Sequence, residues 1–335
     1  MVYQEEPVLF DETRRGFLEY SPLQILSVTS SDGTQRYLEG VDFNVDACNG
    51  ILSLTEQSRI PCLTLIGGEG PCYERFSDGM GNPLFFAEGH VMHDFQVSVH
   101  YSHEHQKYGK NQPEIMHGSF SLQKAQELLT TKRKLRITLI GDSISCGANA
   151  SAVTGVHPFR LPYYHILVET LQTNYAADIH LRNLSRGGAT SSYALQALPT
   201  MLSIPADIVI IAFGMNDATH NVAPSQFRDT IHAVIRRIQL QFPFCEIILI
   251  ASLLPNPVWS CANTNLHKEY LQQLHALSRN ENQVVVADCH SLSAELYRRK
   301  RYPDYSGNNI NHPNDWMHLH YAKQIGRLFG CTCDW

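Results

Sequence analysis

Polar residues capable of catalysis follow short apolar runs in the second half of the chain. Gly141-Asp142-Ser143 comes directly after the apolar, β-branched run at 135–140, and Gly214-Met215-Asn216-Asp217 follows a similar run at 208–213. A short apolar run that ends at turn residues predicts a buried strand. Because ligands bind at the carboxyl ends of parallel strands, the Ser143 hydroxyl and the Asn216 amide are expected to meet at one edge of a sheet.

A serine hydroxyl at such an edge can act as a nucleophile only if a base removes its proton. Asp315-Trp316-Met317-His318 offers a base and a group to orient it. We predict Ser143 as the nucleophile, His318 as the base and Asp315 as the acceptor of the second imidazole N–H. Each residue taken alone is equally well explained as a helix cap or a turn, so the prediction depends on the whole set.

Acyl transfer also needs donors for the developing oxyanion. The Ser143 N–H is one candidate, and Gly188 is a second because a glycine lets the backbone approach a substrate closely. The Asn216 side-chain amide is the third. Loss of one such donor typically costs roughly 2.7–4 kcal/mol of transition-state stabilisation. Asp142, Arg186 and Trp316 are further candidates for substrate contacts.

The elements that would position these groups alternate between strand and helix from residue 135 onward. This alternation predicts βαβ units and a parallel sheet. Strands are expected at 135–140, 178–183, 208–213, 246–253 and 283–287, and helices near 162–174, 191–202, 224–241, 264–279 and 319–329.

Residues 1–130 have short apolar runs and frequent turn signals instead. Gln24–Ser30 and Ile51–Leu54 are typical of strands, and Phe95, Val97, Val99 and Tyr101 alternate with polar residues. Several short strands with close turns predict an all-β, jelly-roll-like sandwich. We therefore predict two domains, a β-sandwich at 1–130 and an α/β domain at 131–335.

The polar segments together resemble the four blocks of the SGNH hydrolases, also called GDSL-type esterases and lipases. The matches are Gly141–Ile144, Asn183 to Gly188, Gly214 to Asp217, and Asp315 to His318. The resemblance covers about residues 135–330 and implies a three-layer α/β/α flavodoxin-like fold and a serine esterase that needs no metal or other cofactor. It assigns Ser143, Asp315 and His318 as the triad, and Gly188 and Asn216 as oxyanion donors.

A β-rich domain ahead of an SGNH domain resembles the layout of several carbohydrate esterases that remove O-acetyl groups. We therefore favour hydrolysis of carbohydrate O-acetyl esters through an acyl-Ser143 intermediate. A lipase or thioesterase, acyl transfer to another hydroxyl, and a non-catalytic carbohydrate-binding protein on the same scaffold remain alternatives. With an ordinary histidine pKa, activity should fall as the pH drops through roughly 6–7.

Composition and charge argue against some classes of binding partner for this protein. The net charge of −6 and the absence of a basic stripe argue against nucleic acid, and no apolar stretch reaches the length of a membrane span. Nine irregularly spaced cysteines and the absence of a secretory leader in this chain predict a reducing, cytoplasmic location. The oligomeric state is left open. No metal site is expected, although six histidines gather at positions 90, 93, 100, 103, 105 and 117.

Overall fold

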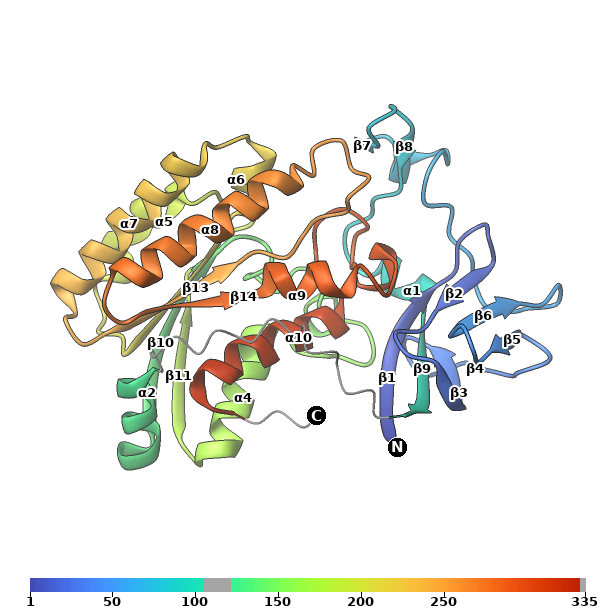
Figure 1. The fold of residues 1–335 in the computed structure, drawn as a ribbon, viewed down its shortest axis with the longest axis horizontal. Helices are drawn as coiled ribbons and strands as arrows, with labels where there is room; N and C mark the ends of the chain where they lie inside the picture. Colours follow the sequence, from blue (N-terminus) through green and yellow to red (C-terminus); the bar gives the residue numbers. More distant parts are fainter. Residues whose placement is uncertain (105–121, 332–335) are drawn as a thin grey trace.

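The computed structural model describes residues 1–104 and 122–331. It contains a region of antiparallel sheets built by the first 104 residues and an α/β region built by residues 122–331 (Figure 1). The predicted division of the chain at residue 130 stays a prediction. Helix α2 (Gln123–Glu127) packs into the core of the α/β region through Ala125.

The α/β region is organised around a parallel sheet of five strands in the order β11-β10-β12-β13-β14. Every residue of β12 and β13 is buried, as expected for strands covered on both faces. The strand order reverses direction between β10 and β12, and ligands of doubly wound sheets bind at this kind of switch point. The strands are β10 (Lys134–Gly141), β11 (Asp178–Asn183), β12 (Ile208–Phe213), β13 (Glu246–Ala251) and β14 (Val284–Asp288).

Helices cover both faces of this sheet, which confirms the three-layer prediction (Figure 1). One face packs against α4 (Tyr163–Tyr175), α9 (Cys289–Leu296) and α10 (Asp315–Gly326). The other packs against α5 (Ser192–Met201), α7 (Pro224–Gln241) and α8 (Thr264–Asn280). The short helices α3 (Ser151–Thr154) and α6 (Met215–Thr219) follow β10 and β12. Helix α10 begins four residues earlier than expected, which changes the interpretation of the site.

The N-terminal region is a sandwich of two antiparallel sheets, β1-β9-β3-β4 and β2-β6-β5. Side chains from both sheets, including Val8, Leu52 and Val99, share one apolar core. The strands are β1 (Val2–Leu9), β2 (Arg15–Phe17), β3 (Pro22–Ser30), β4 (Arg36–Tyr37), β5 (Phe43–Asp46), β6 (Ile51–Leu54) and β9 (Gln96–His103). A hairpin of β7 (Phe76–Ser77) and β8 (Pro83–Leu84) and the short helix α1 (Val91–Phe95) lie between β6 and β9.

The segment after α9 binds the two regions together through charged side chains. Lys300 Nζ lies 3.5 Å from Glu6 Oε2, with both side chains fully buried, and it also donates to the carbonyl of Pro7. Asp304 Oδ1 accepts the N–H of Leu9 at 2.7 Å. A buried charge left without its partner is costly, so these contacts hold the segment in one position against β1.

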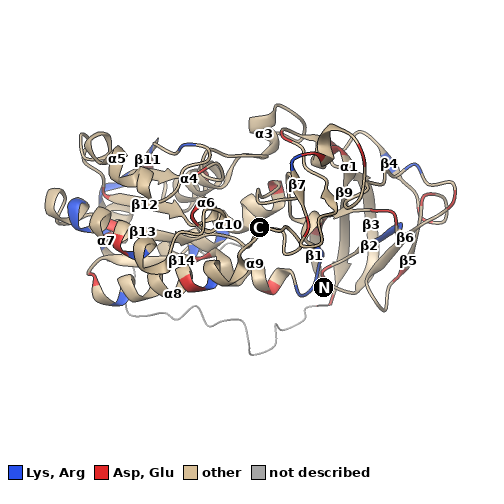
Figure 2. Ribbon diagram, turned by 90° about the horizontal axis from the view of Figure 1, so that it is seen from above, with Lys and Arg blue, Asp and Glu red and all other residues tan. Residues whose placement is uncertain are grey.

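Charged residues are otherwise spread over both regions without segregation by sign (Figure 2). This distribution agrees with the modest net charge of −6. Within residues 1–104 and 122–331, none of the helices has the length and apolar character required to cross a bilayer.

Candidate active site

Ser143 lies in a tight turn directly after β10. The backbone before it is packed so closely that a Cβ on Gly141 would lie 2.5 Å from Ser145 Oγ and 2.7 Å from the Ala212 carbonyl oxygen. After it, the N–H of Ala148 donates to the Ser143 carbonyl oxygen at 3.0 Å. The turn thus fixes a half-buried serine at the carboxyl edge of the sheet.

The imidazole that contacts this serine belongs to His312. Its Nε2 lies 2.8 Å from Ser143 Oγ. Burial lowers the pKa of His312 to about 4, and the charges of His318 and Arg75 make smaller contributions to this shift. The ring is therefore neutral near pH 7, and a neutral imidazole at this distance can take the proton of the serine hydroxyl.

The structure thereby corrects the predicted role of His318. This residue is fully buried, its Nε2 lies 3.0 Å from the carbonyl oxygen of Ala148, and its Nδ1 accepts the N–H of Tyr163 at 3.4 Å. Both ring nitrogens are thus occupied by backbone groups. Asp315 likewise turns to the backbone, where its Oδ1 accepts the N–H of Ser151 at 2.7 Å.

The reason for this correction is the start of α10. The side chain of Asn314 accepts the N–H of Met317 at 3.1 Å and caps the helix, so that the helix begins at Asp315. Residues three apart on a helix share one face. Asp315 and His318 consequently face the chain at 148–151 together and fix the loop that follows Ser143.

The three-residue spacing on which the prediction of Asp315 and His318 rested occurs twice in this segment. Asn309 precedes His312 by three residues, just as Asp315 precedes His318. The helix cap at Asn314 is the sequence signal that could have separated the two, because it places the second pair inside a helix.

Asn309 does not orient His312. Its Nδ2 donates to the Phe85 carbonyl oxygen at 3.0 Å, and its Oδ1 accepts from Asn256 at 3.3 Å. The contact to His312 Nδ1 comes from Asn149, whose Oδ1 lies at 2.8 Å. Among the hydrogen bonds of residues 1–104 and 122–331, none joins His312 to a carboxylate.

The predicted oxyanion donors lie in loops that are tied to one another. Gly188 is exposed in the loop after β11, with φ of 71°. Asn216, in α6, donates from Nδ2 to the Ala189 carbonyl oxygen at 3.0 Å, and an amide nitrogen carries a second hydrogen for another acceptor. Asp217 accepts the Ser191 N–H at 3.0 Å and locks α6 to the Gly188 loop. Their role as oxyanion donors stays a prediction.

The three candidate substrate contacts lie in different surroundings. Asp142 is only 2% exposed, and its Oδ1 accepts the N–H of Ile144 at 2.9 Å, so it supports the turn and does not face a substrate. Trp316 is stacked on Tyr305, with ring centroids 5.2 Å apart, and packs on the apolar core. Arg186 is exposed beside Gly187, its guanidinium 4.0 Å from the ring centroid of Tyr193. Arg186 is the most exposed of the three, and substrate contacts of Arg186 and the half-buried Trp316 stay predictions.

The N-terminal histidines take separate positions. The His103 ring is stacked on Tyr20 with centroids 4.3 Å apart, whereas His93 Nε2 lies 2.8 Å from the carbonyl oxygen of His157. His105 and His117 lie outside the described residues. Within the part of the chain that the structure describes, no group of three or more potential metal ligands comes together.

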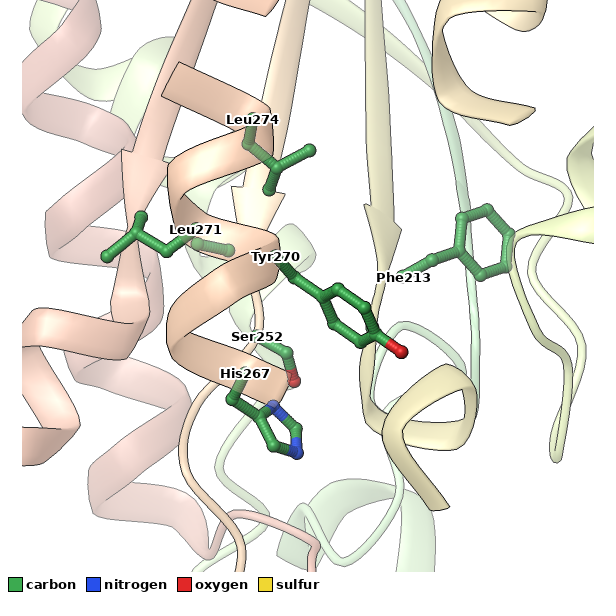
Figure 3. Close-up of a pocket in the computed structure, with 8 residues that line it drawn as sticks. Phe213, Ser252, His267, Tyr270, Leu271 and Leu274 are labelled. Carbon is green, nitrogen blue, oxygen red and sulfur yellow. The ribbon is translucent and has the colours of Figure 1, made fainter. Parts of the chain in front are cut away.

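A small cavity lies between α8 and the chain that follows β12 and β13 (Figure 3). Ser252 Oγ and His267 Nε2 are buried there, and neither makes a hydrogen bond to the described residues. Burial lowers the pKa of His267 to about 3, so this ring is neutral near pH 7. The cavity lies apart from the Ser143–His312 pair and is lined by Phe213, Gly214, Ala251, Ser252, His267, Tyr270, Leu271 and Leu274.

The parallel sheet in this strand order is of the flavodoxin-like type, and a serine–histidine contact lies at its carboxyl edge. The chain belongs to the GDSL-like lipase/acylhydrolase family, whose model matches residues 139–319. It is therefore a carboxylic ester hydrolase. No curated protein matches the chain.

Solved structures share the fold at low sequence identity. A putative GDSL-like lipase from Parabacteroides merdae is 16% identical with a TM-score of 0.50, over 58% of this chain and 95% of that one. A two-domain esterase active on acetylated mannans (CEX) is 21% identical, with a TM-score of 0.49 over 62% of this chain and 53% of that one, about half of its length. The acetyl xylan esterase Axe2 from Geobacillus stearothermophilus is 17% identical, with a TM-score of 0.48 over 58% and 94%.

Proposed function

We propose that this protein hydrolyses O-acetyl esters of carbohydrates through an acyl-Ser143 intermediate, with His312 as general base. The observation that carries this proposal is the 2.8 Å contact between Ser143 Oγ and His312 Nε2 at the carboxyl edge of the sheet. In this proposal His312 takes the role that we predicted for His318.

In the acylation half-reaction, Ser143 Oγ attacks the ester carbonyl carbon while His312 Nε2 takes the hydroxyl proton. The carbonyl oxygen becomes an oxyanion, for which the N–H groups of Ser143 and Gly188 and the Asn216 amide are the proposed donors. When the intermediate collapses, the bond to the sugar oxygen breaks. His312 Nε2–H returns the proton to that oxygen, which leaves as a hydroxyl and leaves Ser143 acylated.

Deacylation repeats the sequence with water. His312 Nε2 takes a proton from water as its oxygen attacks the acyl carbon. Collapse of the second oxyanion breaks the bond to Ser143 Oγ, and the imidazolium returns the proton to this oxygen. The carboxylic acid leaves and ionises in solution, and the free Ser143–His312 pair is restored.

Polar, exposed surroundings support a hydroxylated substrate with a small acyl group. Arg186, Gly187 and Gly188 are exposed in the loop after β11. Asn149, which contacts His312, and Asn311, which precedes it in the chain, are half-buried. Polar groups of this kind hydrogen-bond a sugar and offer no apolar surface for a long acyl chain. The β-rich region ahead of the hydrolase domain is a further point of resemblance to carbohydrate esterases.

We expect a preference for short acyl groups. 4-Nitrophenyl acetate should be hydrolysed with a higher kcat/KM than 4-nitrophenyl octanoate, because an apolar chain gains affinity only where it is buried. Acetate release from acetylated xylan, xylo-oligosaccharides and glucose pentaacetate, with N-acetylated sugars as controls, then tests the substrate class. A preference for the octanoate would instead favour a lipase or thioesterase.

The acid limb of kcat/KM should lie well below that of an ordinary histidine. Because burial lowers the pKa of His312 to about 4, the base stays neutral and active until the pH falls toward that value. Burial raises the pKa of Asp142 to about 7, so this neighbour titrates separately. The Asp142→Asn variant keeps the acceptor for Ile144 and removes that titration. An inflection near pH 6.5 in this variant would contradict the assignment of the acid limb to His312.

A further inference from the structure

We propose that Asn149 is a positioning residue that holds His312 in the one neutral tautomer able to accept the Ser143 proton, and that the N-terminal β region fixes the orientation of Asn149. The inference deepens the proposed function, since it rests on His312 as the base. An amide would thus take the place that a carboxylate fills in most serine hydrolase triads.

The orientation of the Asn149 amide follows from its neighbours. Its Nδ2 lies 2.6 Å from the carbonyl oxygen of Gly89 and 2.9 Å from that of Gly307. A carbonyl oxygen only accepts hydrogen bonds, so the NH₂ group must face these two oxygens. Gly89 belongs to the N-terminal β region and Gly307 to the loop that carries His312. The Asn149 amide therefore bridges the two regions of the protein.

This orientation decides the tautomer of His312. With both amide hydrogens directed at backbone carbonyls, Asn149 presents only its oxygen to the ring, and Oδ1 lies 2.8 Å from His312 Nδ1. The hydrogen must then be on Nδ1. In the neutral ring Nε2 carries a lone pair, which faces Ser143 Oγ at 2.8 Å. The opposite tautomer would place the Asn149 oxygen against a lone pair and could not accept the serine proton.

The backbone is shaped to hold Asn149 in place. Its φ of 62° lies in the left-handed region, which asparagine and glycine adopt more readily than other residues. A Cβ on Gly307 would lie only 2.2 Å from the Asn149 Cβ, so glycine is required there for the close approach. His318 and Asp315 fasten the chain on either side through Ala148 and Ser151. The pair predicted as catalytic thus supports the loop that orients the base.

The electrostatic surroundings of His312 agree with an uncharged partner. The ring contacts Ser143 and Asn149, and the charged groups that shift its pKa are His318, on α10, and Arg75, ahead of β7. Both oppose a positive charge on His312. An aspartate at 149 would place a carboxylate oxygen against the carbonyl oxygens of Gly89 and Gly307, and these acceptors would repel one another. An amide therefore fits this position better than a carboxylate.

Asn149→Gly is the sharpest test, because glycine tolerates the left-handed backbone and only the amide is lost. Asn221→Gly is the matched control, since Asn221 is exposed, has φ of 54° and lies outside the site. We expect kcat for 4-nitrophenyl acetate to fall by about 10–100-fold in Asn149→Gly with KM little changed, and no such loss in the control. Gly307→Ala, which displaces Asn149, should show the same loss of kcat.

The tautomer is read directly from long-range ¹H–¹⁵N NMR spectra of ring-labelled histidines, with His312 assigned by its absence in His312→Gln. In the wild-type protein His312 should be in the Nδ1–H form, and in Asn149→Gly it should shift toward Nε2–H. A wild-type Nε2–H form, or equal kcat in the two Asn→Gly variants, would overturn the proposal. Absence of ester hydrolysis by the wild-type protein would contradict the proposed function. The tautomer of His312 could still be measured in that case, because the spectra do not require turnover.

Discussion

Replacing His312 with glutamine is expected to lower kcat/KM for 4-nitrophenyl acetate on the order of 10⁴–10⁶-fold. Glutamine retains a polar group near Ser143 but cannot take its proton. The loss should appear in kcat at every pH between 5 and 9, because no other imidazole contacts the Ser143 hydroxyl among the described residues. Steady-state rates and melting temperatures of the two proteins, measured in parallel, test the expectation.

His318→Gln is the matched control. A glutamine at this position can still donate to the Ala148 carbonyl oxygen, which His318 Nε2 contacts at 3.0 Å. We expect a lower melting temperature, because a fully buried ring is lost, and a decrease in kcat/KM of at most about tenfold. If His318→Gln were as inactive as His312→Gln and equally well folded, the arrangement around His312 would not be the catalytic one.

Replacing Ser143 with alanine is expected to abolish turnover, with a loss on the order of 10⁶-fold. Without the hydroxyl no acyl-enzyme can form, and only direct attack by water remains. Labelling with a fluorophosphonate, followed by mass spectrometry, should place the adduct on Ser143 in the wild-type protein and show none in the variant. The melting temperature should change little, because the side chain is half-buried and lies at the sheet edge.

Ser145→Ala provides the comparison for this variant. Ser145 lies two residues along the same turn, but its Oγ is buried and 2.7 Å from the hydroxyl of Tyr163. Its loss should cost roughly 1 kcal/mol of stability through the missing hydrogen bond and leave fluorophosphonate labelling intact. Turnover by Ser143→Ala at the rate of Ser145→Ala would exclude a covalent mechanism through Ser143.

The N-terminal sandwich takes part in the site as well as in the fold. In the segment between β8 and α1, which precedes β9, the carbonyls of Phe85 and Gly89 accept hydrogen bonds from Asn309 and Asn149. Asn309 lies in the loop that carries His312, and Asn149 contacts the imidazole itself. Gln96 Nε2 adds contacts to the carbonyl oxygens of Pro303 at 2.8 Å and Ser306 at 2.9 Å. Changes that loosen the sandwich are therefore expected to affect the orientation of the base.

Local sequence patterns determined most of the α/β architecture. The segments at 178–183 and 208–213 form strands with the predicted bounds. The first alternates apolar and polar residues and the second is a continuous apolar run, and the helix at 224–241 also has the predicted bounds. The turn at Ser143 could be placed from a pattern of the same kind. These features depend on residues close together in the chain.

The proposed base, His312, could be recognised only from the tertiary structure. His312 and His318 have equivalent spacing to a polar residue three positions earlier, and the chain alone did not separate them. The helix cap at Asn314 and contacts between distant segments direct His318 to the backbone and His312 to Ser143. Asn149 could not be predicted either, because its orientation depends on Gly89 and Gly307, which lie 60 residues before it and 158 after it. Side chains that act through such long-range contacts leave no periodic signal in the sequence.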